Sequence, residues 1–187
     1  MTPNPTIPLR NAADRYGLVA RALHWTIGLL LLAQLAGGFY VFEFMAKGAT
    51  RSALIGVHKA MGVTILLLVL ARVAWRLYDR PPALPAVMPA LEQAGTRVGH
   101  AALYLAMLAM PLVGLWVADS GGRATDVFGL FEVPVLIGAG ETEFWHEVAE
   151  TTHVWGAYLL LALIALHAIT ALYHKFLKRD ALADRML

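Results

Sequence analysis

The sequence contains no cysteine. Disulfide bonds, thiol chemistry and cysteine-ligated iron–sulfur clusters are therefore excluded. Charged residues are also scarce, because they make up 15% of the 187 residues and leave a formal net charge of only +2. We expect no catalytic side chain of the nucleophilic kind and no nucleic-acid partner.

Apolar residues are abundant instead: 59% of the sequence is hydrophobic and the mean hydropathy is +0.62. A hydrocarbon core of about 30 Å is crossed by roughly 20 apolar residues in a helix. A soluble bundle would need a polar stripe on each helix, and stretches such as TILLLVLA and YLLLALIAL have none. The fold class predicted is all-α, an integral membrane four-helix bundle. Four windows meet the length requirement: 24–42, 53–77, 98–118 and 154–173.

Basic residues orient the predicted bundle. Cytoplasmic connections carry an excess of Lys and Arg near the ends of the spans. Most basic residues precede the first span, separate the second from the third, or follow the fourth, so we expect both termini to be cytoplasmic. Residues 1–14 are predicted to be a disordered cytoplasmic lead, and 15–187 to be one transmembrane domain. The third connection, predicted to lie outside, is acidic: Asp119, Asp126, Glu132, Glu141, Glu143, Glu147 and Glu150.

Seven histidines accompany these spans, and four of them follow a regular spacing near the C-terminus. Ionisable groups at membrane depth are costly and normally face the bundle interior for a functional reason. The predicted topology divides the seven histidines between two depths in the membrane. Those predicted on the cytoplasmic side are His24, His100, His167 and His174, and those on the outer side are His58, His146 and His153.

The fourth span carries one interior histidine near each leaflet. Fourteen residues turn a helix by about 1400° and advance it by about 21 Å, so His153 and His167 share one face. This arrangement suits two planar cofactors stacked through the bilayer, each held by this helix and by another. On the outer side the partner is His58; on the cytoplasmic side it is His24 or His100.

Residue size one turn along each helix favours one set of ligands. A porphyrin held by a helical histidine lies against that helix, so the residue four positions later should be small. At that offset His100, His146 and His174 are followed by bulky residues. The small residues are Gly28, Gly62, Ala157 and Ala171, which follow His24, His58, His153 and His167. This pattern selects the pairs His24–His167 and His58–His153, with Gly28 and Gly62 beside the cofactor.

Five ordered segments and the closing RML resemble the bacterial cytochrome b561 family: RYGLVARALHW (15–25), GVHKAMG (56–62), GHAALYLAMLAMPLVG (99–114), VFGLFEVP (127–134) and ALHAITALYHKF (165–176). The resemblance implies a four-span, di-haem b protein of the bacterial inner membrane. Carried over by position, it implies haem ligation by His24, His58, His153 and His167, in agreement with the set chosen above.

Further expectations concern the groups around the haems. Two imidazoles fill both axial positions of an iron, which favours electron transfer over oxygen binding. Quinone carbonyls need hydrogen-bond donors that deliver protons, so His100 and His174 are the candidates for a quinone site. Haem propionates are anionic and need cationic partners. The available ones are Arg15, Arg21, Arg72 and Arg97 inside, and Arg51 and Lys59 outside.

The resemblance implies electron exchange between a periplasmic donor and membrane ubiquinone, and one activity known in the family is superoxide:ubiquinone oxidoreductase. The acidic outer connection disagrees with capture of an anion, although Lys47, Arg51, Lys59 and Arg123 lie on the same side. The alternatives are a non-catalytic relay that docks a cationic periplasmic redox protein, and a cytochrome b anchor subunit of a larger oxidoreductase. A haem-free proton or metal transporter is a more distant alternative. In every case membrane lipid is a partner.

Overall fold

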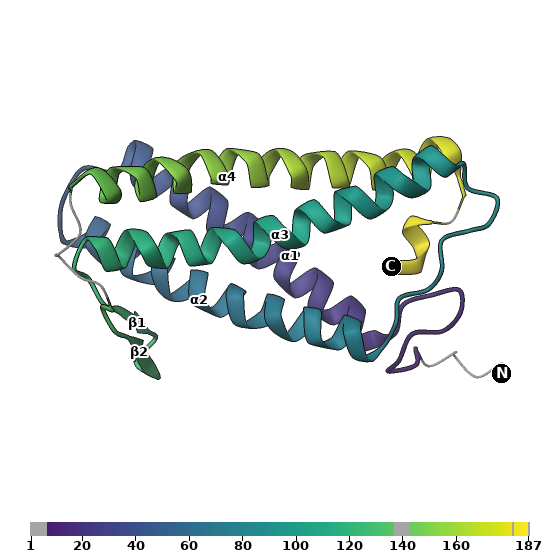
Figure 1. Ribbon diagram of the computed structural model, residues 1–187, viewed down its shortest axis with the longest axis horizontal. Helices are drawn as coiled ribbons and strands as arrows, with labels where there is room; N and C mark the ends of the chain where they lie inside the picture. The colour runs from purple at the N-terminus through teal and green to yellow at the C-terminus, as the bar shows by residue number, and fades with distance from the viewer. Residues whose placement is uncertain (1–6, 137–142, 181, 187) are drawn as a thin grey trace.

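The computed structural model of the protein describes residues 7–136, 143–180 and 182–186. Its described residues include four helices long and apolar enough to cross a membrane. Each predicted window lies inside one of them, and the all-α membrane bundle is confirmed (Figure 1). The elements in chain order are α1 (Leu18–Phe39), η1 (Tyr40–Phe44), α2 (Ala49–Tyr78), α3 (Ala90–Ser120), β1 (Thr125–Val127), β2 (Phe131–Val133), α4 (Glu143–Leu172), η3 (Tyr173–Lys178) and η4 (Ala183–Met186).

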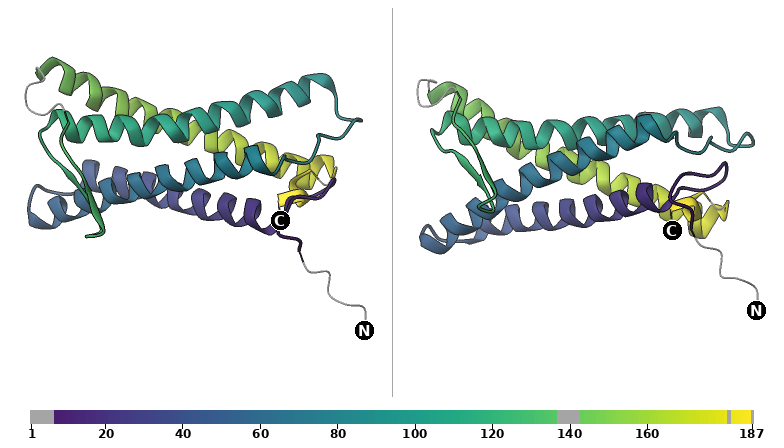
Figure 2. Two further views of the ribbon diagram at one scale, coloured as in Figure 1. Left: turned by 60° about the horizontal axis from the view of Figure 1, so that its bottom comes forward. Right: turned by 90° about the horizontal axis from the view of Figure 1, so that it is seen from below.

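Consecutive long helices run in opposite directions, and the four helices stay side by side in both turned views (Figures 1 and 2). Both termini and the connection between α2 and α3 lie at one end of the bundle, which we call the terminal end. The connection between α1 and α2 and the hairpin β1–β2 lie at the other, the hairpin end. Because the number of spans is even, both termini lie on the same side of a membrane. That this side is the cytoplasm stays a prediction.

The middle of the bundle is packed by branched apolar side chains. Ile65 and Val69 of α2 are 1% and 0% exposed, and they join Ile27, Leu31 and Leu160 in one buried cluster. A close helix contact accompanies this cluster, because a Cβ added at Gly156 of α4 would collide with the Met110 sulfur of α3. Close approach at small residues is the usual way in which membrane helices associate.

Large apolar side chains also cover the outside of the bundle. Leu67, Leu105, Leu159 and Leu166, from three of the helices, are each at least half exposed. An exposed apolar surface of this extent is unfavourable in water but matches the lipid tails of a bilayer. The outward face of the helices is therefore the lipid-facing surface.

The N-terminal segment lies at the terminal end of the bundle, beside the end of α2. Residues 1–6 of the predicted disordered lead lie outside the described residues. Asn11, within the described part of that lead, receives a hydrogen bond on its side chain from Gly17 and donates to the carbonyls of Asp79 and Arg80. Its backbone N–H also donates to the Asp79 carboxylate at 2.9 Å. These bonds join the chain before α1 to the end of α2.

A short antiparallel hairpin closes the opposite end of the bundle and was not predicted from the sequence. Thr125 pairs with Val133 and Val127 with Phe131. The turn uses two positive φ angles, at Phe128 (53°) and Gly129 (71°), and the Gly129 N–H donates to the Asp126 carboxylate. Lys59 of α2 donates to the Ala124 carbonyl at 2.7 Å, so the hairpin is attached to α2.

Candidate functional site

Two groups of histidines lie inside the bundle, at two depths. Toward the hairpin end, His58 of α2 and His153 of α4 face each other with ring centroids 6.2 Å apart and planes at 84°. Toward the terminal end, His24 of α1 lies 6.1 Å from His167 of α4, centroid to centroid, with an interplanar angle of 63°. As predicted from the helix period, α4 contributes one histidine to each group.

The group near the terminal end has a third member. His100 of α3 lies 5.5 Å from His167, centroid to centroid, with an interplanar angle of 59°. Both partners considered for His167 on sequence grounds, His24 and His100, therefore lie beside it. The helix period and the topology placed these three residues together, but could not choose between the two partners without the residue-size argument.

The ring spacings test whether haem iron fits between the pairs. An imidazole nitrogen binds a transition metal at roughly 2 Å and lies about 1 Å from its ring centroid, so two imidazoles on opposite sides of one metal have centroids roughly 6 Å apart. The His58–His153 and His24–His167 spacings of 6.2 and 6.1 Å match this value, and the His100–His167 spacing of 5.5 Å is shorter. The residues present therefore fit two bis-histidine haems.

The number of protein ligands that haem iron needs matches the two histidine pairs. In the part of the chain that the structure describes, no set of three or more His, Asp or Glu side chains is arranged to hold a metal ion. A porphyrin supplies four of the six iron ligands, so the protein must supply the other two. Pairs of imidazoles meet that requirement.

Backbone and side chains of the neighbouring helices hold the His58–His153 pair in place. The side-chain amide of Gln34 on α1 donates to the His58 carbonyl at 2.8 Å. A Cβ added at Gly38 of α1 would lie 2.9 Å from Cε1 of His58, and one added at Gly114 of α3 would lie 3.0 Å from Cε1 of His153. Each ring therefore lies directly against the backbone of an adjacent helix.

The glycines chosen from the sequence lie in more open surroundings. A Cβ at Gly28 would meet nothing within 4 Å among the described residues, and one at Gly62 would meet only the Gln34 amide nitrogen, at 3.5 Å. Sequence reasoning missed Gly38 and Gly114, because it followed offsets along the helix of each histidine. Gly38 and Gly114 lie on different helices from the histidines that they contact. Predicting these contacts would require knowing how the helices are aligned against one another.

The second ring nitrogen of His153 has a distinct environment. Nδ1 is buried, has no hydrogen-bond partner of regular geometry among the described residues, and lies near the Met110 backbone. A ligating histidine commonly directs its other N–H to a backbone carbonyl, which fixes the orientation of the ring. The Met110 carbonyl is the acceptor available for that bond.

Cationic and phenolic side chains adjoin the group near the terminal end. A guanidinium nitrogen of Arg72, Nη2, lies 3.2 Å from Nδ1 of His24, and Nε of Arg72 donates to the Tyr104 hydroxyl at 2.9 Å. Arg76, one turn further along α2, lies over the Tyr104 ring. Within the described residues, Arg72 is therefore the predicted cytoplasmic-side cation that contacts a candidate haem ligand directly.

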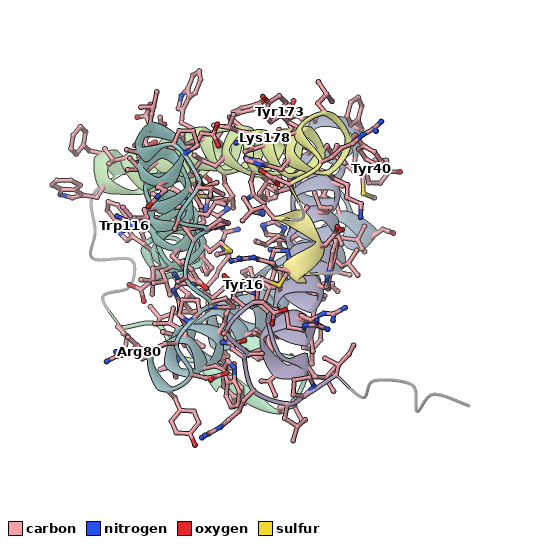
Figure 3. The ribbon with its side chains drawn as sticks, turned by 90° about the vertical axis from the view of Figure 1, so that its right-hand side faces the viewer. Tyr16, Tyr40, Arg80, Trp116, Tyr173 and Lys178 are labelled. Atoms are coloured by element: carbon pink, nitrogen blue, oxygen red, sulfur yellow. The ribbon has the colours of Figure 1, made fainter. Side chains whose placement is uncertain are left out.

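His174, a predicted quinone-site residue, is buried at the terminal end. Its Nδ1 lies 2.6 Å from the Asp180 carboxylate, and Lys178 beside it pairs with Glu92 of α3. Figure 3 views this end, with Tyr173 and Lys178 labelled at the two ends of η3. Burial raises the pKa of Asp180, but hydrogen bonds from His174 and the Leu182 N–H, with the nearby positive charges, outweigh it and hold that pKa below its ordinary value.

His146 lies at the hairpin end, apart from both pairs. Its Nδ1 is 2.8 Å from the hydroxyl of Ser120, at the end of α3, and its Nε2 is 3.4 Å from the Glu150 carboxylate. The Ser120 contact joins the end of α3 to the beginning of α4, and the Glu150 contact lies within α4.

Four membrane-spanning helices with facing histidine pairs at two depths are the arrangement of an integral-membrane b-type cytochrome. A family model described as prokaryotic cytochrome b561 matches residues 15–187. The chain therefore belongs to the prokaryotic cytochrome b561 family, as the sequence motifs indicated. Membership implies haem b as cofactor and electron transfer in a bacterial membrane.

Relatives of known name support this assignment over nearly the whole chain. Cytochrome b561 homolog 2 of Escherichia coli strain K12 is 29% identical over 178 residues, 95% of this chain and 93% of the relative. A protein named probable superoxide oxidase CybB, from Yersinia pestis, is 28% identical over 92% of this chain and 96% of its own length. Cytochrome b561 homolog 1 of E. coli is 25% identical over 93% and 97%, respectively.

Proposed function

We propose that this protein holds two haems b and exchanges electrons between a periplasmic donor and ubiquinone in the bacterial inner membrane. His24 with His167, and His58 with His153, are the proposed ligand pairs. The observation that supports the proposal most strongly is the pair of ring spacings, 6.1 and 6.2 Å, with one histidine of each pair on α4. Stacked along one helix, the two sites lie on a path through the bilayer.

The chain's own residues bind and orient the cofactor. Each ligating nitrogen must be unprotonated, and the buried surroundings that disfavour a charged imidazole maintain that state. Gln34 holds His58 through its hydrogen bond to the His58 carbonyl, while packed apolar side chains between the two sites exclude water. When bound, haem would supply one-electron oxidation and reduction, and ligation by two histidines would favour electron transfer over oxygen binding.

Orientation in the membrane follows from the basic residues at the terminal end. The positive-inside rule assigns that end to the cytoplasm, so the His24–His167 pair serves the inner leaflet and the His58–His153 pair serves the outer one. A donor in the periplasm then meets the hairpin end. Quinone, which is confined to the lipid, exchanges electrons at the opposite site.

The quinone site that we propose is near His100 and His174. Reduction of a quinone to a quinol consumes two electrons and two protons, so the site needs groups that deliver protons from the cytoplasm. His174, hydrogen-bonded to Asp180 at 2.6 Å, can receive a proton at the surface and hold it inside the bundle. His100, in ring contact with His167, lies deeper and closer to the redox centre.

Two kinds of periplasmic donor are consistent with the proposal. With superoxide, two anions each lose one electron to give two molecules of oxygen, and one quinone gains both electrons and two protons. The name of the Yersinia pestis relative supports this donor. The hairpin end supports a cationic redox protein instead, because the carboxylates described there are exposed: Asp126, Glu132, Glu143, Glu147 and Glu150.

The basic residues at the hairpin end are partly engaged within the protein. Arg51 donates to the Val41 carbonyl at 3.1 Å and Lys59 to the Ala124 carbonyl at 2.7 Å. Arg123 is exposed and lies near enough to Lys59 for their charges to interact. This pair forms a small basic spot within an acidic surface, and the net field of that surface favours a positively charged partner.

The first experiment is a pyridine haemochrome assay of the purified protein together with a redox titration. We expect two equivalents of protohaem per chain and two separate midpoint potentials. A colourless protein, or one equivalent of haem in a fully folded preparation, would refute the di-haem proposal.

The donor is tested by measuring reduction of the oxidised protein at several ionic strengths. Superoxide as donor predicts rapid reduction that ends when superoxide dismutase is added. A cationic redox protein as donor predicts negligible reduction by superoxide at every salt concentration, and binding of a basic c-type cytochrome that weakens steeply with salt. Neutralising Glu147 and Glu150 together would weaken that binding and leave the superoxide rate no lower.

A further inference from the structure

Two buried hydrogen-bond donors on one face of α2 have no partner. Among the described residues, Nη1 of Arg72 and Nε1 of Trp75 are both buried and without a hydrogen-bond acceptor. Residues three apart on a helix are neighbours on its surface, so Arg72 and Trp75 lie on the same face of α2. An orphaned buried donor costs about 1–3 kcal/mol, and a charged one costs more. An acceptor that reached both N–H groups would remove this cost.

The charge of Arg72 indicates that the acceptor is an anion. Carboxylates at the terminal end already have other partners: Asp79 with Asn11, Glu92 with Lys178, and Asp180 with His174. In the described part of the chain no ion pair involves Arg72, although the residue lies at membrane depth beside His24. A cation in such a position is normally paired.

The contact between Arg72 and His24 is not compatible with ligation through Nε2. A guanidinium group only donates, so the 3.2 Å contact requires an unprotonated Nδ1 on His24. A neutral imidazole that binds iron through Nε2 carries its proton on Nδ1. When His24 ligates, the guanidinium must therefore turn away from the ring, and it needs another acceptor close by.

We propose that Arg72 and Trp75 together bind a propionate carboxylate of the haem held by His24 and His167, an inference that rests on the proposed di-haem function. A carboxylate has two oxygens and accepts one hydrogen bond from the guanidinium and one from the indole. The Tyr104 hydroxyl, bonded to Nε of Arg72 at 2.9 Å, fixes the guanidinium from its other side. The two residues are positioning residues that orient the haem and balance its charge.

The test uses the intact holoprotein, produced in cells that make haem with isotopically labelled propionate carboxyl carbons. Redox-difference infrared spectra then identify the bands that belong to the propionates. Three variants are compared: Arg72→Gln, which removes the charge; Trp75→Phe, which removes the N–H and keeps the ring; and Arg76→Gln, the matched control. Arg76 is on the same helix and over the same Tyr104 ring.

We expect the labelled carboxylate bands to shift in Arg72→Gln and in Trp75→Phe and to remain unchanged in Arg76→Gln. Loss of a charge-assisted hydrogen bond should also accelerate haem release from that site to excess apomyoglobin by roughly tenfold or more in Arg72→Gln. If Arg72→Gln fails to retain the haem, Trp75→Phe decides, because it leaves the charge unchanged and keeps an aromatic side chain at this position.

Unchanged carboxylate bands in both variants, with two haems still bound, would overturn the inference and leave the di-haem function intact. In that case the acceptor is a phospholipid phosphate or a quinone carbonyl. Absence of a second haem from the wild-type protein would instead refute the proposed function itself. The two failures are therefore distinguishable in one set of samples.

Discussion

Gly38 of α1 lies directly against the imidazole of His58 on α2: a Cβ added at Gly38 would be 2.9 Å from Cε1 of that ring. Side-chain carbons essentially never approach so closely, so a substitution there must move the ring. The neighbouring Gly37 has open space where its Cβ would lie. Two consecutive glycines thus differ in what they contribute, and only one of them faces the candidate ligand.

We predict that Gly38→Ala perturbs the outer haem. Displacing a ring in a packed interior costs about 1–3 kcal/mol, so the occupancy or the ligand geometry at the His58–His153 site should change. Haem stoichiometry and the low-spin electron paramagnetic resonance signals of the oxidised protein measure this. Gly37→Ala is the control and should retain both haems with unchanged signals. Identical spectra for the two variants would contradict the predicted contact.

His24 and His100 provide a second prediction, because both lie beside His167. The His24–His167 spacing of 6.1 Å fits one metal between two imidazoles, and the His100–His167 spacing of 5.5 Å fits it less well. We expect His24→Ala to remove one of the two haems and His100→Ala to retain both. The pyridine haemochrome assay gives the stoichiometry directly. Loss of one haem from His100→Ala alone would reassign the ligand.

The sequence was sufficient for the parts of this structure that depend on periodicity. Apolar windows predicted the four long helices, and the fourteen-residue interval predicted that His153 and His167 point to the same side of α4. Each of these depends on a single helix, whose geometry is constant from one protein to another. The topology of four spans then brought His58 to one end and His24 and His100 to the other.

The remaining features depend on how helices are rotated and shifted against one another. The contacts of Gly38 with His58 and of Gly114 with His153 are of this kind, as is the position of Arg72 among several candidate cations. Arg72 was one of several basic residues that the sequence offered as partners for the haem propionates, and the sequence alone could not show which of them lies beside a ligand. The hairpin was missed because Asp126 and Gly129 determine its turn within a segment of only a few residues.

A third prediction concerns His174, which is buried but belongs to neither of the two proposed ligand pairs. Replacing it with alanine should leave the haem spectrum intact and slow quinol-dependent reduction, because a proton carrier is lost and no ligand is. Stopped-flow reduction of the oxidised protein by a quinol, compared with reduction by dithionite, separates the two effects. His146→Ala at the hairpin end is the control and should not alter the quinol rate. A missing haem in His174→Ala would reassign this residue as a ligand.

The fourth prediction is a pH dependence of the structure at the terminal end. The pKa of Asp180 is lowered below its ordinary value of 3.8: burial acts to raise it, but the hydrogen bonds from His174 and the Leu182 N–H, together with nearby positive charge, outweigh burial. Because the folded-state pKa is the lower one, ionised Asp180 contributes stability that is fully present above the unfolded value and is lost as pH falls through the folded one. Its contribution should thus be complete at pH values above about 5 and decline below about 4.

Hydrogen exchange of the backbone amides in residues 182–186, followed at decreasing pH, measures this contribution. Asp180→Asn removes the ionisable group, so its exchange should be faster than that of the wild type at about pH 6, and the two should converge as the wild-type carboxylate is protonated. Asp14→Asn is a suitable control, because that residue pairs with Arg15 on the exposed surface and does not contact His174. A constant difference between wild type and Asp180→Asn down to the lowest pH at which the bundle stays folded would show that the charge of Asp180 does not stabilise this end. The C-terminal segment would then be held by its other contacts, such as the bond from the Trp25 indole to the Met186 carbonyl at 3.1 Å.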